Sequence, residues 1–532
     1  MTFAFPTSRA PCGIFWVDDH ESPSIDRPTR NLRAIAVENA VTPPERIRRL
    51  NDRPERSGGD FVLYWIQMYH RAEQNWALTS AVEAASRLAL PLVVYHGLGY
   101  TYPHANDRIH RFILEGVAEL AERFAHRGIL YHFYLRRRAA DPNDLLYRLA
   151  RRAALVVTDD FPAFFIPDQT TRVASRLDVA MSAVDSNGIV PLAAIPGEQY
   201  GAYTLRPRLR RLLPDHLGLV PEPSVTRDSL DLRLDVPETR VTLDSLDSLI
   251  AGCAIDHSVP PSSVYRGGYR EARSRLDRFI AGPLHTYSTA RNQPGAETTS
   301  RLSPYLHFGQ VSPQDIALAV RDAAHAPREH RDAYLEELIV RRELGYNFCH
   351  FNPNHRSLDA LPLWANATLS AHAGDPRPQL YSLEEFEAAL THDYLWNAIQ
   401  GELLTTGLMF GYYRMYWGKK IIEWSRTPGE AQAVMILLHE KYALDGRNAN
   451  TYSNILWCFG KHDRPWFERP VFGKVRYMSL GGMETKTNVA SYVDRVNRWC
   501  AEAGRPDLCV QAPVKPTRTK RNCERRKPHG PR

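Results

Sequence analysis

Short apolar runs alternate with amphipathic stretches between residues 60 and 200. The run FVLYWI, which begins at Phe61, is rich in β-branched and aromatic residues, and the runs at 90–98, 128–135 and 154–160 have the same character. The stretches at 76–88, 107–126 and 141–153 have the spacing of helices. In the longest of these, one apolar stripe comprises Ile109, Phe112, Ile113, Val117, Leu120 and Phe124. Strands that alternate with helices in this way predict βαβ units and a parallel sheet.

The pattern changes to helical periodicity from about residue 263 to residue 498. We therefore predict an α/β fold in which an N-terminal, Rossmann-like parallel-sheet domain precedes a larger all-α domain. The predicted divisions are a flexible lead-in at 1–58, the α/β domain at 59–200, a connection with little regular order at 201–262, the helical domain at 263–500 and a basic disordered tail at 510–532. The lead-in is assigned from its Pro, Arg, Asp and Ser content.

The net charge of the chain is concentrated in its last 23 residues. Lys and Arg number 67 against 60 Asp and Glu over the 532 residues, which gives +7. Residues 510–532 contain eight Lys and Arg and one Glu, so the rest of the chain is neutral overall. A pI of 8.9 therefore does not by itself indicate a surface that binds nucleic acid. The tail either adds affinity for phosphate or only keeps the chain in solution.

Simple counts exclude several classes of protein. No stretch reaches the roughly 18 apolar residues of a transmembrane helix, and the N-terminus lacks the basic and apolar regions of a secretory signal. The seven cysteines include no Cys-x-x-Cys pair, which argues against a disulfide framework, a zinc ribbon and a compact four-cysteine iron–sulfur site. We therefore expect a cytoplasmic protein that holds no metal and enters no membrane.

Tryptophans cluster in the second half of the chain. Six of the ten lie between Trp364 and Trp466, and Trp417 and Trp424 stand seven residues apart on a predicted helix, on one face and about 10 Å from each other. Trp396, in the preceding helical run, could fall between them. The spacing is compatible with electron transfer and with ordinary core packing.

Two further segments contain candidate ligands for phosphates and bases. SPYLHFGQVSP at 303–313 follows the polar loop ETTSRLS, whose hydroxyl and N–H groups could hold phosphate, although Ser-Pro is also an ordinary helix start. The segment at 444–479 interleaves arginines with Tyr452, Trp457, Trp466 and Phe472. This pattern suits stacking on bases and neutralisation of phosphates, and a loop-rich packing layer is the alternative.

Seven strings in this order resemble the photolyase/cryptochrome flavoproteins, and in particular the class II cyclobutane pyrimidine dimer photolyases. They are YWIQMYHRAEQNWAL at 64–78, LRPRLRRLL at 205–213, TTSRLSPYLHFGQVSP at 298–313, YLEELIVRRELGYNFC at 334–349, THDYLWNAIQGEL at 391–403, YRMYWGKKIIEW at 413–424 and HDRPWFERPVFGKVRYMS at 462–479. The resemblance covers about residues 60–500. It implies a monomeric carbon–carbon lyase of the deoxyribodipyrimidine photo-lyase type, which binds FAD in the helical domain and acts on UV-damaged DNA.

The resemblance also implies which residues form the FAD site. Asp445 would face the polar edge of the isoalloxazine, with Arg414 as its salt-bridge partner, and Asn450 lies in the same segment. The phosphates and ribitol would be held by Tyr287, Thr299, Ser300, Arg301, Leu302 and Ser303. His439 stands where the family has an Asn near flavin N5, and this change would either alter the redox state of the flavin or only replace one hydrogen bond.

A reaction follows from the same resemblance. The excited, reduced flavin would pass an electron to a pyrimidine dimer flipped out of the duplex, the cyclobutane ring would split and the electron would return. Glu337 would hydrogen-bond the dimer. Trp417, Trp396 and Trp424, in this order outward, would photoreduce the oxidised flavin. The lesion and the gap left in the DNA would be contacted by Tyr381, Met415, Trp457, Arg464 and Trp466.

Departures from the family's pattern leave other functions open. Besides the change at His439, DGRNANTY replaces DGRDPNGY at 445–452, and Phe410 stands where a His is common. The alternative is a blue-light sensor of the cryptochrome kind that binds FAD but repairs nothing, and a photolyase for the (6-4) photoproduct is a third interpretation. The α/β domain is of the type that can hold an antenna chromophore, a deazaflavin or a folate, and no motif decides between them. We expect the protein in the cytoplasm, at the nucleoid when bound to DNA.

Overall fold

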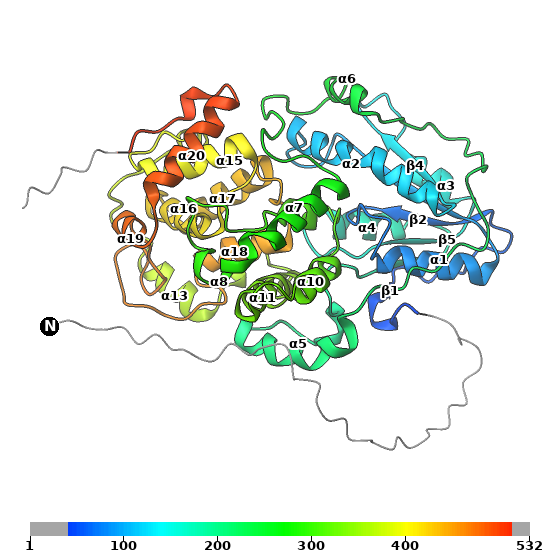
Figure 1. Ribbon diagram of the computed structural model, residues 1–532, viewed down its shortest axis with the longest axis horizontal. Coiled ribbons are helices and arrows are strands. Elements are labelled where there is room, and N and C mark those ends of the chain that lie inside the picture. Colours follow the sequence, from blue (N-terminus) through cyan, green and yellow to red (C-terminus); the bar gives the residue numbers. More distant parts are fainter. Residues whose placement is uncertain (1–40, 513–532) are drawn as a thin grey trace, which may run out of the picture.

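Residues 41–512 are described by the structure, a computed structural model, and they form a parallel-sheet half and a larger helical half (Figure 1). The sheet has six strands in the order β1-β6-β5-β2-β3-β4, and only β1 runs antiparallel to its neighbour. The strands are β1 (Ile47–Arg49), β2 (Phe61–Ile66), β3 (Leu92–Leu98), β4 (Leu130–Leu135), β5 (Ala153–Asp159) and β6 (Met181–Val184). The predicted α/β fold followed by a helical half is confirmed.

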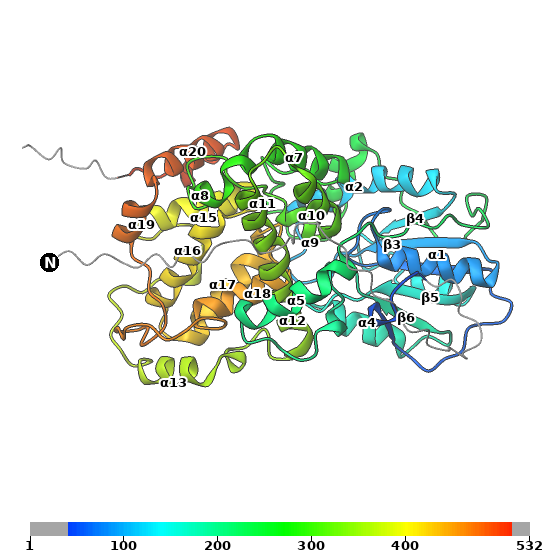
Figure 2. The ribbon, with the colours of Figure 1, turned by 60° about the horizontal axis from the view of Figure 1, so that its bottom comes forward.

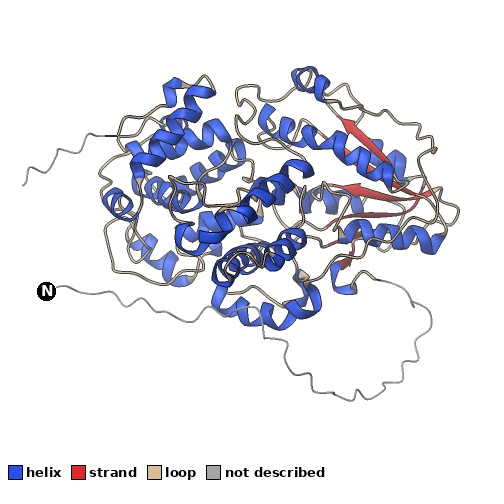
Figure 3. Cartoon of the chain, in the orientation of Figure 1, coloured by secondary structure: helices blue, strands red, loops and turns tan. Residues whose placement is uncertain are grey.

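Helices cover the sheet, which is why its central strands can be apolar on both faces (Figure 3). Every residue of β2 and of β5 is buried, so these strands need no alternation of apolar and polar side chains. Helices α1 (Trp76–Leu88), α2 (Asp107–His126) and α3 (Leu145–Ala150) pack on the strands, and α4 (Ile166–Ala174) leads to β6. The side chains of Asn75 and Asn106 accept hydrogen bonds from backbone N–H groups in the first turns of α1 and α2, which fixes where these helices begin.

The chain joins the sheet before residue 58, where we predicted a lead-in without order. The turn η1 (Pro44–Arg46) is followed by β1, which pairs with β6. The buried guanidinium of Arg46 donates to the carbonyl oxygens of Asp185 and Ile189. The sequence of β1, IRR, has no apolar alternation, so this strand depends on tertiary pairing and leaves no local signal. Residues 1–40 and the part of the predicted basic tail at 513–532 lie outside the described residues.

The predicted connection at 201–262 also contains more order than expected. Helix α5 (Ala202–His216) buries Leu205, Leu209 and Leu213, which follow one another at intervals of four residues. Pro207 and Pro214 lie inside it, and because proline ordinarily ends a helix they obscured this period. The turn η3 (Leu243–Ser245) and helix α6 (Leu246–Ala251) follow after a stretch without regular structure.

The helical half packs against the sheet half through a continuous apolar core. Its elements are α7 (Tyr269–Ala281), α8 (Tyr287–Ala290), α9 (Ser303–His307), α10 (Pro313–Asp322), α11 (Arg328–Leu335), the π-helix η5 (Glu336–Arg341), α12 (Arg342–Phe351), α13 (Leu363–Ala371), α14 (Leu383–Glu387), α15 (Tyr394–Thr406), α16 (Gly411–Trp424), α17 (Pro428–Tyr442), α18 (Ala449–Cys458), α19 (Leu480–Lys486) and α20 (Val489–Glu502). Figure 2 shows α5, α9 and α10 at the junction of the two halves. None of the helices within residues 41–512 has the length and apolar character needed to cross a membrane.

Candidate active site in the helical half

A cavity of about 840 Å³ opens in the helical half, between α16, α18, η5 and the loop before α9. Its volume lies in the upper part of the range for sites that bind cofactors and other small molecules. The residues that we predicted from the sequence and that line it are Tyr287, Thr299, Ser300, Arg301, Leu302, Ser303, Glu337, Arg414, Met415, Trp417, His439, Asp445, Asn450 and Trp457. The structure therefore brings most of the predicted site together from segments far apart in the sequence.

An ion pair lies on one wall of the cavity. The Nη2 atom of Arg414 is 3.0 and 3.1 Å from the two carboxylate oxygens of Asp445. Burial alone would raise the pKa of Asp445, but the guanidinium of Arg414 and the hydroxyl of Ser303 hold this pKa below its usual value, so the carboxylate stays charged. The buried Nε of Arg414 has no hydrogen-bond partner among the described residues.

The residue after Asp445 has to be a glycine. At Gly446, a Cβ would lie 1.9 Å from the carbonyl oxygen of His439, so only glycine lets the chain turn here.

The loop before α9 contributes hydroxyl groups and positive charge. Arg301 has a φ of 54°, and its guanidinium is 2.9 Å from the fully buried carboxylate of Glu402. The hydroxyl of Tyr334 donates to that of Ser300 at 2.9 Å. The cavity lining as a whole contains six arginines and two carboxylates. Carboxylates pair with five of these arginines, so the net charge of the wall is small. The guanidinium and hydroxyl groups nevertheless offer N–H and O–H donors of the kind that phosphate oxygens accept.

His439 of α17 lies on the cavity wall as a neutral side chain. Its Nδ1 is 2.8 Å from the carbonyl oxygen of Met435, so Nδ1 carries the proton and Nε2 remains as an acceptor. Burial and, second, the positive charge of Arg414 lower the pKa of His439 to about 4. The imidazole meets the ring of Trp417 edge to face, with centroids 5.1 Å apart. An Asn at this place could donate or accept, whereas His439 offers the cavity one acceptor.

Glu337 lies in the first turn of η5, the π-helix between α11 and α12. π-Helices are rare in proteins, and those that occur are often found at functional sites. The carboxylate of Glu337 accepts from Arg291 at 2.7 Å, and 43% of its side chain is exposed. The neighbouring Glu336 pairs instead with Arg206 of α5. Our sequence analysis missed Arg291, since nothing in its local sequence marks it as a partner of a glutamate 46 positions away.

Three buried tryptophans form a row that leads away from the cavity. Trp417 lines the cavity, and its ring lies parallel to that of Trp396 at a centroid distance of 6.0 Å. Trp396 meets Trp424 edge-on at 6.1 Å, so the expectation that Trp396 falls between the other two is confirmed. The indole N–H of Trp417 donates to the side-chain oxygen of Gln400 at 3.0 Å, and that of Trp396 to the carbonyl oxygen of Trp417 at 3.1 Å.

Tyr381 is absent from the cavity lining, where the resemblance would place it, and lies instead at the outer end of this row. Its ring meets that of Trp424 edge-on at 5.6 Å, and its backbone N–H donates to the carbonyl oxygen of Trp424 at 3.2 Å. The reason is that the segment before α14 packs on the C-terminal end of α16, whereas Arg414 and Met415 contribute to the cavity from the first turns of that helix. The assignment of Tyr381 to the lesion pocket is therefore corrected.

The loop between α18 and α19 forms an aromatic and basic rim beside the cavity. Trp466 and Arg464 lie in it and are not part of the cavity lining. The guanidinium of Arg476, which does line the cavity, lies 4.0 Å from the ring centroid of Trp466 and 5.4 Å from that of Trp457. Asp463 accepts from Arg476 at 2.9 Å and fixes its position. Arg476, which we did not predict, thus connects the rim to the cavity.

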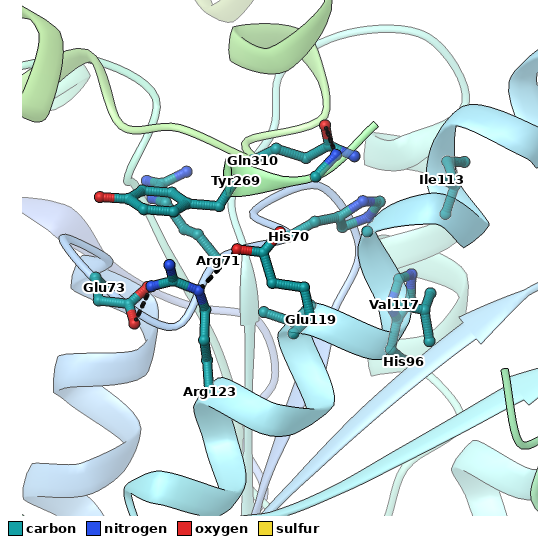
Figure 4. A pocket seen from close by; sticks show the side chains of 13 residues that line it. His70, Arg71, Glu73, His96, Ile113, Val117, Glu119, Arg123, Tyr269 and Gln310 are labelled. Atoms are coloured by element: carbon teal, nitrogen blue, oxygen red, sulfur yellow. Dashed lines mark hydrogen bonds and ion pairs between the residues drawn. The ribbon is translucent and has the colours of Figure 1, made fainter. Parts of the chain in front are cut away.

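A much smaller cavity lies at the junction of the two halves (Figure 4). Its volume of about 10 Å³ is near the minimum for a single water. His70 and His96 line it with ring centroids 4.4 Å apart. Burial lowers the pKa of His70 to about 4. A deazaflavin or folate does not fit in this volume, so this cavity is no candidate for an antenna site.

Known proteins resemble the chain over most of its length. Residues 62–225 match the family model described as DNA photolyase. A deoxyribodipyrimidine photo-lyase of Methanothermobacter thermautotrophicus is 40% identical over 453 residues, which cover 85% of this chain and 98% of that protein. The enzyme of the same name from Arabidopsis thaliana is 38% identical over 444 residues, covering 82% and 88%. The crystal structure of a class III photolyase from Agrobacterium tumefaciens superposes with a TM-score of 0.61 at 18% identity, covering 83% and 87%, and shows likeness of fold alone.

Proposed function

This chain belongs to the DNA photolyase family, and from that membership we propose that it is a class II enzyme that uses light and FAD to repair cyclobutane pyrimidine dimers. The observation that carries the proposal is the composition of the large cavity. The Arg414–Asp445 pair lies on its wall, Glu337 reaches it from η5, and Trp417 connects it to the tryptophan row. A monomer is sufficient, since all these groups come from one chain.

The residues present fit FAD, the cofactor that family membership implies. The ionised Asp445 can accept from the N–H edge of a flavin ring, and the guanidinium of Arg414 holds this carboxylate in its charged form. The hydroxyls of Ser300 and Ser303 and the arginine-rich lining suit a diphosphate. We assign Tyr287, Thr299, Leu302 and Asn450 to the same site because they line the same cavity. An antenna chromophore in the sheet half, deazaflavin or folate, remains part of the proposal.

When it is bound and reduced, the flavin supplies the light-excited electron that opens the cyclobutane ring. Glu337 orients the lesion by hydrogen bonding, and Arg291 holds its carboxylate in place. Met415 and Trp457 supply an apolar wall that keeps water from the reacting bases. His439 can accept a hydrogen bond at Nε2 and stays neutral, so it adds no charge beside the Arg414–Asp445 pair.

The rim is suited to hold DNA around a flipped-out dimer. Flipping costs a few kcal/mol, and less at a damaged step. Trp466 can stack in the gap that the dimer leaves, Arg464 can contact phosphate, and the neighbouring Phe467 is 91% exposed. An aromatic side chain so exposed has little role within the fold itself, which favours a role in binding.

Two measurements on the purified protein test the proposal. We expect the absorption spectrum of a flavin, and we expect blue light to remove pyrimidine dimers from DNA when the flavin is reduced. Protein that is folded but binds no flavin would refute the proposal. Protein that binds flavin and responds to blue light but leaves the dimers intact would instead select the cryptochrome-like sensor, and repair of (6-4) photoproducts alone would select the third interpretation.

A further inference from the structure

We propose that His372 is a positioning residue, which as an imidazolium holds a hairpin of the rim where Trp466 can enter the gap in duplex DNA. The hairpin comprises residues 466–474. The proposal deepens the proposed function and rests on it, because a duplex from which a dimer has been flipped is the ligand that the rim would meet. It makes the preference for duplex over single-stranded DNA depend on this one side chain and on pH.

The hairpin has few hydrogen bonds of its own. The backbone N–H of Trp466 donates to the carbonyl oxygen of Lys474 at 2.8 Å. Nearer the tip, Arg469 and Gly473 exchange two backbone hydrogen bonds, of 2.9 and 2.8 Å. At the tip, Val471 has a φ of 70°, which strains a β-branched residue. A lone hairpin is at best marginally stable, so the shape of this one depends on the groups to which it is attached.

His372, in the turn after α13, attaches the hairpin through two carboxylates. Its Nε2 is 3.0 Å from Oε1 of Glu468 in the hairpin, and its Nδ1 is 2.6 Å from Oδ2 of Asp375. The same oxygen of Asp375 accepts from the backbone N–H of Val471 at 2.8 Å. The imidazole also packs closely on the hairpin, since a Cβ at Gly473 would lie 2.8 Å from Cδ2 of His372.

Only the protonated form of His372 satisfies both carboxylates. An imidazolium donates from both nitrogens, whereas a neutral imidazole donates from one and turns a lone pair toward the other carboxylate. Among the described residues, the other charges near this cluster are Arg377 beside Asp375 and Lys474 beside Glu468. The hydrogen bonds with Glu468 and Asp375 raise the pKa of His372 above 6.5. The attachment is therefore complete below about pH 6.5 and is lost as the pH rises through the raised pKa.

The attachment matters for the side chains that are proposed to meet DNA. Glu468 directly follows Trp466 and Phe467 in the chain, so its anchor on His372 restricts how far these aromatic residues can move. Phe467 is 91% exposed, so little else in the fold holds it. A dimer in single-stranded DNA leaves no gap between paired bases, and it does not need the hairpin. Loss of the attachment should therefore weaken binding to duplex DNA and spare binding to the single strand.

Dark binding of the FAD-loaded protein to a thymine dimer, in duplex and in single-stranded DNA, tests this by fluorescence anisotropy between pH 6 and 9. We expect the ratio of duplex to single-strand affinity to fall about fivefold over this range, the effect of about one exposed ion pair. His372→Gln should have the low ratio at every pH. Glu468→Gln should show a smaller change with pH, because its amide can pair with a neutral imidazole. A merely structural role of His372 would lower the ratio without removing its pH dependence.

His257→Gln is the matched control. Nδ1 of His257 is 2.7 Å from Asp107 at the start of α2 in the sheet half, and this carboxylate likewise raises the pKa of His257. The variant should keep the wild-type profile, and the profile of His372→Gln in its place would overturn the inference. A wild-type ratio that does not change with pH, or equal loss of both DNAs in His372→Gln, would also overturn it and leave the proposed function standing. Flavin-loaded protein that binds neither DNA overturns both.

Discussion

The Arg414–Asp445 pair allows a quantitative test of the cavity's electrostatics. Asp445→Asn keeps the shape of the side chain but leaves the guanidinium without its counter-charge, at a place where 15% of the Arg414 side chain and 9% of the Asp445 side chain are exposed. Removal of one member of a buried pair costs about 3–5 kcal/mol. Because Arg414 retains some contact with solvent, we expect the free energy of unfolding to fall by about 3 kcal/mol.

Urea unfolding of the flavin-free protein, followed by circular dichroism, measures this loss. The control is Asp178→Asn, which breaks the pair between Arg56 and Asp178, whose side chains are 31% and 68% exposed. Its loss should stay below about 1 kcal/mol. Equal losses in the two variants, or a loss below about 1 kcal/mol for Asp445→Asn, would show that water solvates Arg414 well enough that its unpaired charge does not destabilise the fold. Titration with FAD should further show weaker binding to Asp445→Asn alone.

Two other residues of the cavity give predictions of different kinds. Glu337→Gln should lower the yield of dimer repair by reduced protein without loss of flavin, whereas Glu336→Gln on the same turn should repair normally; similar yields in both would contradict the role of Glu337. The lowered pKa of His439 means that the unfolded chain binds a proton more readily, so the stability that this residue contributes is complete above about pH 6.5 and is lost as the pH falls toward 4. At about pH 5 this amounts to roughly 2 kcal/mol, which His439→Asn should recover in unfolding experiments; the same acid sensitivity in the variant would refute the assignment.

The sequence predicted those elements whose local pattern agrees with their tertiary environment. The helices at 76–88 and 107–126 begin and end as predicted, because each has a cap residue and one apolar stripe. β1 and β6 were missed because three or four residues carry too little periodicity. The helix α5 was missed because its two prolines argued against a helix, although its leucines have helical spacing. These errors lie where the stability of an element comes from its neighbours in space and not from its own residues.

The residues of the candidate site were likewise predicted where the resemblance marks them and missed where only a contact in space does. Most of the residues that the resemblance assigned to the site do line the cavity. Arg291 and Arg476 were missed because they act through partners that are remote in the sequence. Tyr381 was assigned to the wrong end of α16 because a position in a string says nothing about which end of a helix it packs against. Its contact with His392 could be found only in three dimensions.

Two tryptophans, Trp417 and Trp457, line the cavity, and their surroundings decide which one is more easily oxidised. The ring centroid of Trp457 lies 5.1 Å from the ammonium group of Lys419 and 5.4 Å from the guanidinium of Arg476. Burial lowers the pKa of Lys419 to about 8, which still leaves it mostly protonated at neutral pH. Two cations stabilise the neutral indole and oppose a positive charge on it. The neighbour of Trp417 is the neutral His439, so Trp417 should be the electron donor.

Trp417→Phe should therefore stop photoreduction of the oxidised flavin while leaving repair by chemically reduced protein nearly unchanged. Any photoreduction that remains in this variant should pass through Trp457, and it should increase when Arg476→Gln removes one of the two cations. An equal loss of photoreduction and repair in Trp417→Phe would refute the role of the row. Residual photoreduction that does not respond to Arg476→Gln would show that geometry, and not the charge around Trp457, selects the donor.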